Sequence, residues 1–343
     1  MLFLEGISFY STYKNMIIIL SRSDDGSTMY VAEWLTYLNK EYIIVNSDDY
    51  RALFSSYNSK ENELLFTVNS KQINLLLAES VWNRRNGFSM KSIGINLSSK
   101  ESVFLNVNDD YYVSHRKEEL RYLLDFVHYT FASKGIKQLG NFRFNDVNKM
   151  VVLDIARKVG LRIPNSFILS TKNELIKLKN DYPKRKIISK ALSQGVYRIE
   201  DEVNYYNYVE RISDVILKSL PETFFPSLFQ IEIVKKYELR IFYLNEKCYS
   251  MVVFSQKSKK TITDFRKPNL GNKNRKLPYL LPNLVKNKIV KLMKALSLNT
   301  GSLDMIVDSD DNYTFLEVNP VGQFSMTSYP CNYYLEKKIA EYL

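Results

Sequence analysis

Two carboxylates and one carboxamide near the C-terminus have the residue types and spacing of a divalent metal site. Asp304 lies in the apolar run 301–306, and Glu317 and Asn319 lie in the next run, 315–320. Residues two apart on a strand share a face, so Asp304 can lie opposite Glu317 and Asn319 if the runs pair. Three oxygen ligands suit Mg²⁺, which takes a few carboxylates plus substrate phosphates. Because unpaired charge among apolar residues is costly, we favour this site over a solvent-exposed sheet face.

Two lysines stand where they could meet phosphates. Lys149 begins a predicted helix, and Lys190 ends a predicted buried strand just before the flexible turn 193–195. A loop that follows a strand lysine could cover a nucleotide. The sequence contains neither a P-loop nor a Gly-x-Gly-x-x-Gly fingerprint, so a nucleotide enzyme here must use another fold.

A strand, a polar turn and a second strand over residues 229–240 could form a hinge. Backbone groups near Glu232 and Ile233 could contact an adenine edge, and Glu238 could accept a hydrogen bond from a ribose hydroxyl. Arg240 is placed to stabilise charge that develops during phosphoryl or acyl transfer. The alternative is an ordinary edge hairpin.

The elements that must position these residues alternate between strands and helices. A strand over 17–20, a helix over 31–38 and a strand over 42–45 predict a parallel α/β unit. A boundary is predicted near 135–140, and no internal repeat is evident. Apolar spacing predicts further helices over 114–135, 150–159, 171–180 and 282–296, and further strands over 167–169, 186–190, 229–234, 238–244, 249–254, 302–307 and 313–318.

Composition excludes several classes of protein. The chain has 343 residues, of which 45% are hydrophobic, too many for a disordered chain. Two cysteines cannot form a disulfide framework, and they suggest a reducing compartment. The apolar run 16–20 is too short to span a bilayer, and it lacks the flanks of a signal peptide. We therefore expect a cytoplasmic protein without a membrane partner.

The net charge of +11 favours acidic partners. Residues 256–296 contain twelve Lys or Arg residues and a single acid, Asp264. A solvated surface would explain many of these lysines equally well. The aromatic residues are spread through apolar runs, and no nucleic-acid-binding motif is present, so a non-enzymatic nucleic-acid-binding protein is the distant alternative.

Taken in this order, the signals resemble the ATP-grasp superfamily over residues 148–324. Within it, the sequence looks most similar to the graspetide (microviridin-type) synthetases, with the grasp-with-spasm peptide maturases as the nearest group. Asp264-Phe265-Arg266 stands where Asp-Trp-Arg is more usual. The other segments that support this resemblance are 24–28, 80–85, 238–240 and 317–324.

The resemblance implies an α/β ATP-grasp fold in three parts. After an N-terminal extension, 1–15, these would be an N-terminal pre-grasp domain, 16–137, a central lobe, 138–229, and a C-terminal lobe, 230–343. ATP would lie between the two lobes, with Mg²⁺ held by the metal site described above. The residues implied to bind ATP are Lys149, Lys190, Gln230, Glu232, Ile233 and Glu238.

The resemblance also implies an activity. A substrate Asp or Glu carboxylate would attack the γ-phosphate of ATP, and a hydroxyl or amine of the same peptide would then displace phosphate. Arg240 and Arg266 would clamp the acylphosphate, and Arg84, Arg85 and Asp264 would bind the substrate. The implied partner is an acidic ribosomal precursor peptide with a leader and a core, and the implied assembly is a homodimer.

Two alternatives stay open at this point. The same fold could serve an amino-acid or glutamate ligase that acts on a free small molecule or a protein terminus. Arg84 and Arg85 could instead be a surface pair that closes a salt bridge.

Overall fold

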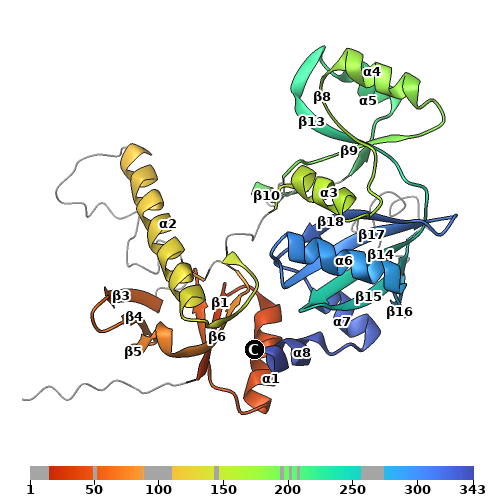
Figure 1. The fold of residues 1–343 in the computed structure, drawn as a ribbon. Coiled ribbons are helices and arrows are strands. Elements are labelled where there is room, and N and C mark those ends of the chain that lie inside the picture. The colour runs from red at the N-terminus through yellow and green to blue at the C-terminus, as the bar shows by residue number, and fades with distance from the viewer. Residues whose placement is uncertain are drawn as a thin grey trace, which may run out of the picture. The chain divides into compact units, whose positions relative to one another are not determined.

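The computed structural model describes residues 15–48, 52–85, 87–88, 110–142, 147–193, 197–200, 203–206, 209–255 and 274–343. The chain divides into two compact units (Figure 1). One comprises Met1–Asn145 together with Tyr334–Leu343, and the other comprises Asp146–Tyr333. Within the described ranges, no helix is long and apolar enough to cross a membrane.

The first unit is built on a parallel sheet. Its strand order is β2-β1-β6-β7, and α1 joins β1 to β2 as the sequence predicted. All six residues of β1 are buried, as expected for a central strand of a parallel sheet. The elements of this sheet are β1 (Met16–Ser21), α1 (Gly26–Tyr37), β2 (Tyr42–Asn46), β6 (Ala78–Asn83) and β7 (Lys137–Leu139).

A small antiparallel sheet and a long helix complete this unit. The sheet has the order β3-β4-β5, and its apolar residues share a core with β1 and with Val127 and Phe131 of the helix. The predicted helix over 114–135 is confirmed as α2. The elements are β3 (Ala52–Asn58), β4 (Glu63–Val68), β5 (Lys71–Asn74), η1 (Leu75–Leu77) and α2 (Asp110–Ser133).

The C-terminal helix α8 (Leu335–Tyr342) belongs to the first compact unit. It packs against α1. Lys40 Nζ donates to the Ala340 carbonyl at 3.1 Å, and Ser80 Oγ donates to the Leu343 carbonyl at 2.9 Å. The apolar face of α8 therefore completes the N-terminal unit.

The first sheet of the second unit is antiparallel, with the order β12-β9-β13-β8. Its core consists of Leu175, Leu178, Ile187, Phe229 and Ile231. The elements between Ser166 and Ile231 are β8 (Ser166–Thr171), α4 (Lys172–Asp181), β9 (Ile187–Lys190), the hairpin β10 (Tyr197–Glu200) and β11 (Val203–Tyr206), β12 (Glu210–Arg211), α5 (Asp214–Ser219) and β13 (Thr223–Ile231).

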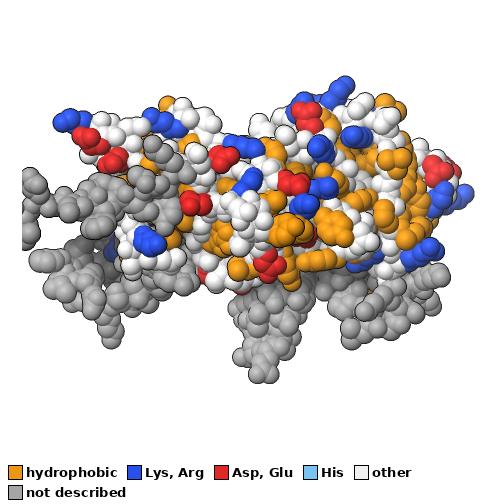
Figure 2. Space-filling view, turned by 90° about the horizontal axis from the view of Figure 1, so that it is seen from below, with side chains coloured by type: hydrophobic (Ala, Val, Ile, Leu, Met, Phe, Trp, Pro, Cys, Tyr) orange, Lys and Arg blue, Asp and Glu red, His pale blue; other side chains and the backbone are white. Residues whose placement is uncertain are grey.

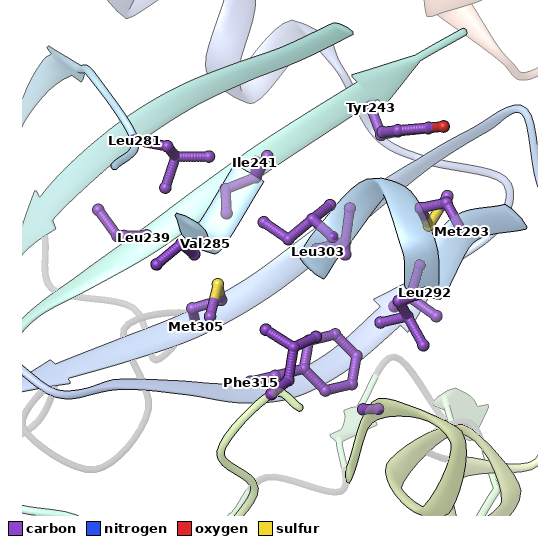
Figure 3. Close-up of a cluster of buried hydrophobic side chains, with 14 of the residues drawn as sticks. Leu239, Ile241, Tyr243, Leu281, Val285, Leu292, Met293, Leu303, Met305 and Phe315 are labelled. Carbon is purple, nitrogen blue, oxygen red and sulfur yellow. The ribbon is translucent and has the colours of Figure 1, made fainter. Parts of the chain in front are cut away.

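The second sheet of this unit is also antiparallel, with the order β16-β15-β14-β17-β18. One of its faces packs against α6, and the core between them includes Leu239, Ile241, Leu303, Met305 and Phe315 (Figure 3). The elements are β14 (Lys235–Leu244), β15 (Lys247–Phe254), β16 (Arg275–Tyr279), α6 (Asn283–Ala295), β17 (Thr300–Asp308), β18 (Tyr313–Asn319) and α7 (Ser325–Cys331).

Helix α3 (Lys149–Lys158) packs on this second sheet, although it precedes the first sheet in the chain. Val152, Leu153 and Ala156 are part of the core beneath α6. The Phe315 N–H donates to the Arg162 carbonyl at 2.8 Å, which ties the end of this segment to β18. The domain boundaries predicted at 137/138 and 229/230 remain predictions.

Candidate active site

The predicted metal ligands share one face of the second sheet. Asp304 pairs with Glu317 across β17 and β18, and Ser302 pairs with Asn319. The side chains of alternate residues point to opposite faces, so Leu303 and Met305 fill the core while the three oxygen-bearing side chains lie on the other face. The β17–β18 hairpin thus produces the arrangement that the spacing predicted.

Both predicted phosphate lysines lie beside Glu317. Lys149 Nζ and Lys190 Nζ are each 4.0 Å from Glu317 Oε2, although one lysine begins α3 and the other ends β9. Lys149 Nζ also donates to the carbonyls of Ala191, at 3.0 Å, and Ser193, at 2.6 Å. Two cations therefore converge on one carboxylate at a partly buried surface.

Arg240 and Asp304 are bonded to each other. They face each other across β14 and β17, and Arg240 Nη1 donates to Asp304 Oδ1 at 3.0 Å and to Oδ2 at 2.9 Å. Arg240 is 8% exposed, and its Nε is buried with no hydrogen-bond acceptor among the described residues. Arg240 and Asp304 were predicted to have separate roles, and their pairing was not predicted.

Glu238 lies in a second buried cluster on β14. It accepts hydrogen bonds from Lys235 and, at 2.6 Å, from Ser255 Oγ. Burial raises the pKa of Glu238, and Lys235 and Ser255 oppose that rise. Sequence reasoning missed Lys235 and Ser255. Residues three apart on a regular strand face opposite sides, and the register shift between Lys235 and Tyr237 gives no signal in the sequence.

The hinge residues are held by neighbours in the first sheet. Gln230 is buried, and its Nε2 donates to Ser166 Oγ at 2.8 Å, so its side chain is engaged with β8. Glu232 forms an ion pair with Arg211, and Ile233 is half-buried. The strand predicted over 229–234 ends at Ile231, because the chain leaves the first sheet there to enter the second.

The candidate substrate residues Arg84 and Arg85 lie in the first unit, around the start of α1. Asp25 caps the helix, accepting from the Ser27 N–H at 3.1 Å, and it also pairs with Arg84 at 3.0 Å and Arg85 at 2.8 Å. Burial alone would raise the pKa of Asp25, but Arg84, the Ser27 hydroxyl and Arg85 outweigh it and lower that pKa to about 2.

Arg84 is 2% exposed, whereas the Arg85 side chain is 27% exposed. Burial lowers the pKa of Arg84 to about 10, and Asp25 partly offsets this effect. Both arginines thus pair with Asp25, but Arg84 is buried, so the two do not form the surface pair of the alternative. Their binding of substrate stays a prediction. Sequence reasoning did not assign a role to Asp25, although a helix-capping aspartate directly after a buried strand was a usable signal.

Asp264 and Arg266 lie outside the described residues. The other candidate residues fall into two groups. Arg84 and Arg85 belong to the first unit, and the remaining ones belong to the second.

No protein-family model matches the sequence, and no curated protein matches it. Solved structures do match. A RiPP-associated ATP-grasp ligase from Chryseobacterium gregarium, in complex with ADP and a leader and core peptide, is 24% identical, with a TM-score of 0.78 and 96% of each chain covered. The macrocyclase MdnC from Microcystis aeruginosa MRC, bound with precursor peptide MdnA, is 24% identical, with a TM-score of 0.75 and coverage of 96% of this chain and 99% of that one.

A more distant match is the D-alanyl-alanine synthetase A from Vibrio cholerae. It is 14% identical, with a TM-score of 0.54 and coverage of 90% of this chain and 89% of that one. These likenesses extend over nearly the whole chain, and they confirm the fold that the sequence led us to expect. The chain has the α/β fold of the ATP-grasp ligases.

Proposed function

We propose that this chain is an ATP-dependent peptide ligase. It activates Asp or Glu side chains of a ribosomal precursor peptide as acylphosphates and forms intramolecular ω-ester or ω-amide crosslinks. The observation that carries the proposal is the convergence of Lys149 and Lys190 on Glu317, on the sheet face that also holds Asp304 and Arg240. The ATP-grasp fold supports the same conclusion.

The side chains on this face fit Mg²⁺ and a nucleotide triphosphate. Asp304, Glu317 and Asn319 would hold Mg²⁺ through oxygen atoms, the ligands that this ion prefers. When bound, Mg²⁺ would offset the repulsion between a substrate carboxylate and the triphosphate. Lys149 and Lys190, which already face a carboxylate, would contact the phosphates.

Arg240 fits a position where negative charge develops. Its guanidinium is largely buried, it already neutralises Asp304, and its Nε has a hydrogen atom without an acceptor among the described residues. A buried donor of this kind favours an anionic partner. We propose Arg240 as one clamp on the acylphosphate, and Arg266, assigned from the sequence, as the other.

The chemistry balances in two steps. A carboxylate oxygen of the peptide bonds to the γ-phosphorus of ATP, and the bond from that phosphorus to the bridging oxygen breaks, releasing ADP. A hydroxyl or amine of the same peptide then bonds to the acyl carbon, loses its proton, and displaces phosphate. Each cycle therefore converts one ATP to ADP and phosphate and removes one water from the peptide.

The proposed partner is an acidic precursor peptide. Two of the similar structures contain precursor or leader and core peptides. Within the described part of the basic segment, residues 274–296 contain six Lys or Arg residues and no acid. On the face seen in Figure 2, Lys and Arg are scattered among acidic and apolar side chains, which argues against nucleic acid as a partner of that face.

A homodimer and a cytoplasmic location are also part of the proposal. Cys248 and Cys331 are both free thiols, as expected in a reducing compartment. Burial raises the pKa of Cys248 to about 11, which disfavours the reactive thiolate form at neutral pH.

Mass spectrometry of an acidic precursor peptide encoded beside the gene, incubated with the protein, ATP and Mg²⁺, tests the activity. We expect losses of whole water molecules that disappear in Glu317→Ala. The matched control is Glu246→Ala, which removes an exposed carboxylate paired with Lys294 in the same unit and should leave the water losses intact. An unchanged peptide mass would contradict the proposal.

A small-molecule ligase is the second candidate, because the D-alanyl-alanine synthetase shares the fold. It predicts an unchanged peptide together with ATP consumption when free amino acids are supplied. The same reaction mixtures, assayed for ADP, separate the two activities.

A further inference from the structure

Arg211 holds the beginning of the segment that joins the two sheets of the second unit. Residues 232–234 connect β13 to β14. Arg211, on β12, donates from Nε to both carboxylate oxygens of Glu232 at 3.0 Å, and from Nη2 to Oε1 at 2.7 Å. The Glu232 side chain is 13% exposed and the Arg211 side chain 35%, so the carboxylate of this charge-assisted contact is largely shielded from water.

The backbone around Glu232 is held at the same place. The Glu232 N–H donates to the Lys186 carbonyl at 2.8 Å, and the Ile231 N–H donates to the Asn165 carbonyl at 3.1 Å. Arg211 itself is anchored, because it pairs with Ile188 in the β12–β9 ladder. Backbone and side chain together fix the start of the connecting segment to the first sheet.

We infer that Arg211 is a positioning residue for recognition of the nucleotide base. This inference rests on the proposed function, in which backbone groups near Glu232 and Ile233 contact adenine. Adenine offers a donor beside an acceptor on one edge, which a peptide carbonyl and an N–H complement only when the peptide is held in place. Arg211 holds it through the Glu232 carboxylate, without touching the base.

The ion pair also controls what the Glu232 carboxylate can accept. Guanine carries two adjacent N–H donors on its pairing edge, and a free carboxylate accepts from both. The Arg211 fork already donates to both oxygens of this carboxylate and offsets its charge, which weakens its acceptance of further donors. Arg211 therefore has two effects. It holds the connecting segment 232–234 in place, and it favours adenine over guanine.

Calorimetric titration with ADP, GDP and inorganic tripolyphosphate, each with Mg²⁺, tests this role. In Arg211→Ala we expect ADP affinity to fall about tenfold, as for loss of a charge-assisted contact. Tripolyphosphate has no base, so its affinity should change less than about twofold. The ratio of ADP to GDP affinity should fall.

Further variants separate positioning from general stability. Arg211→Lys keeps the charge but loses the fork, so it should recover only part of the ADP affinity. Glu232→Gln leaves the charge of Arg211 unchanged. It should lower ADP affinity without a matching loss of tripolyphosphate affinity, and it tests the role even if Arg211→Ala does not fold. Lys179→Ala, which breaks an exposed pair with Asp214 in the same part of the chain, is the matched control and should bind like the wild type.

Equal weakening of ADP and tripolyphosphate in these variants would overturn the inference, as would unchanged ADP affinity. Wild-type protein that bound neither compound would overturn the proposed function itself, and the inference with it. A wild type that bound tripolyphosphate and ADP, with variants that bound both normally, would overturn the role of Arg211 alone.

Discussion

At the scale of single residues, Asp25 links the stability of the first unit to pH. Its pKa is about 2 in the folded chain, below the ordinary value of 3.8, because its two arginine neighbours and Ser27 outweigh burial. A carboxyl group whose pKa is lowered by folding stabilises the fold above its unfolded pKa, and this contribution is lost as the pH falls toward the folded pKa.

Asp25→Asn should therefore lower the free energy of unfolding by about 2 kcal/mol near neutral pH. The difference in the free energy of unfolding between variant and wild type should become smaller as the pH falls below about 4. Urea unfolding at a series of pH values measures it. Asp24→Asn, at an exposed side chain paired with Arg22, is the control. A difference in unfolding free energy that did not depend on pH would contradict the account.

Arg240 and Asp304 are bonded to each other, although Arg240 is proposed to contact phosphate and Asp304 to bind a metal ion. Removing one partner leaves the other charge largely buried. Arg240→Ala should cost about 2 kcal/mol of stability, and Arg240→Ala with Asp304→Ala should cost less than the sum of the single changes. Thermal unfolding of the three variants measures the coupling.

The exposed pair of Arg157 and Asp154 provides the comparison for this cycle. It lies on the solvent side of α3, where such pairs contribute little. Arg157→Ala should change stability by less than about 0.5 kcal/mol. Strictly additive losses at Arg240 and Asp304 would show that the bond between them has no role in stability.

At the scale of elements, α8 completes the N-terminal unit from the far end of the chain. Leu335 and Ile339 are buried on its inner face against that unit. Ile339→Ala should destabilise the first unit by about 2–4 kcal/mol through lost burial and a cavity. Hydrogen exchange should show faster opening in β1 and α1 and unchanged protection in β14 and β17.

The control for α8 is Glu341→Gln, a change at a half-exposed side chain on the same helix. It should leave hydrogen exchange in both units as in the wild type. Equal loss of protection in β14 and β17 in Ile339→Ala would contradict the assignment of α8 to the first unit alone.

Local sequence patterns predicted the elements better than their partners. The β17–β18 hairpin followed from two apolar runs around a short turn, and it placed Asp304 opposite Glu317. Helix α3 was predicted from its spacing, but an apolar helix face does not specify which sheet it covers. Its packing on the second sheet, like that of α8 on the first unit, depends on contacts between distant parts of the chain.

The same limit applies to side-chain partners. Lys149 and Lys190 were singled out by their places at the ends of elements, and both reach Glu317. Arg211 was not singled out from the sequence, because β12 has only two residues and gives no periodic signal. Its contact with Glu232 forms only once the strands are arranged in the order β12-β9-β13.

At the scale of the whole molecule, the net charge of +11 should act on the rate and strength of encounter with an acidic precursor. The basic segment, residues 256–296, begins with Lys257, Lys259 and Lys260. Changing all three to Gln should weaken precursor binding at low salt and have much less effect at high salt, because salt screens long-range attraction between charges.

Binding titrations at two ionic strengths test whether the precursor is attracted by the lysines of residues 257–260 or by the overall charge of the protein. Lys177, Lys179 and Lys184 changed to Gln remove the same total charge from another segment, so a loss specific to the 257–260 variant would locate the contact with the precursor. Equal losses in both triple variants would mean that only the overall charge attracts the peptide. A loss that persists undiminished at high salt would mean that these lysines contribute something other than long-range attraction, since salt at that concentration screens charges beyond a few ångströms.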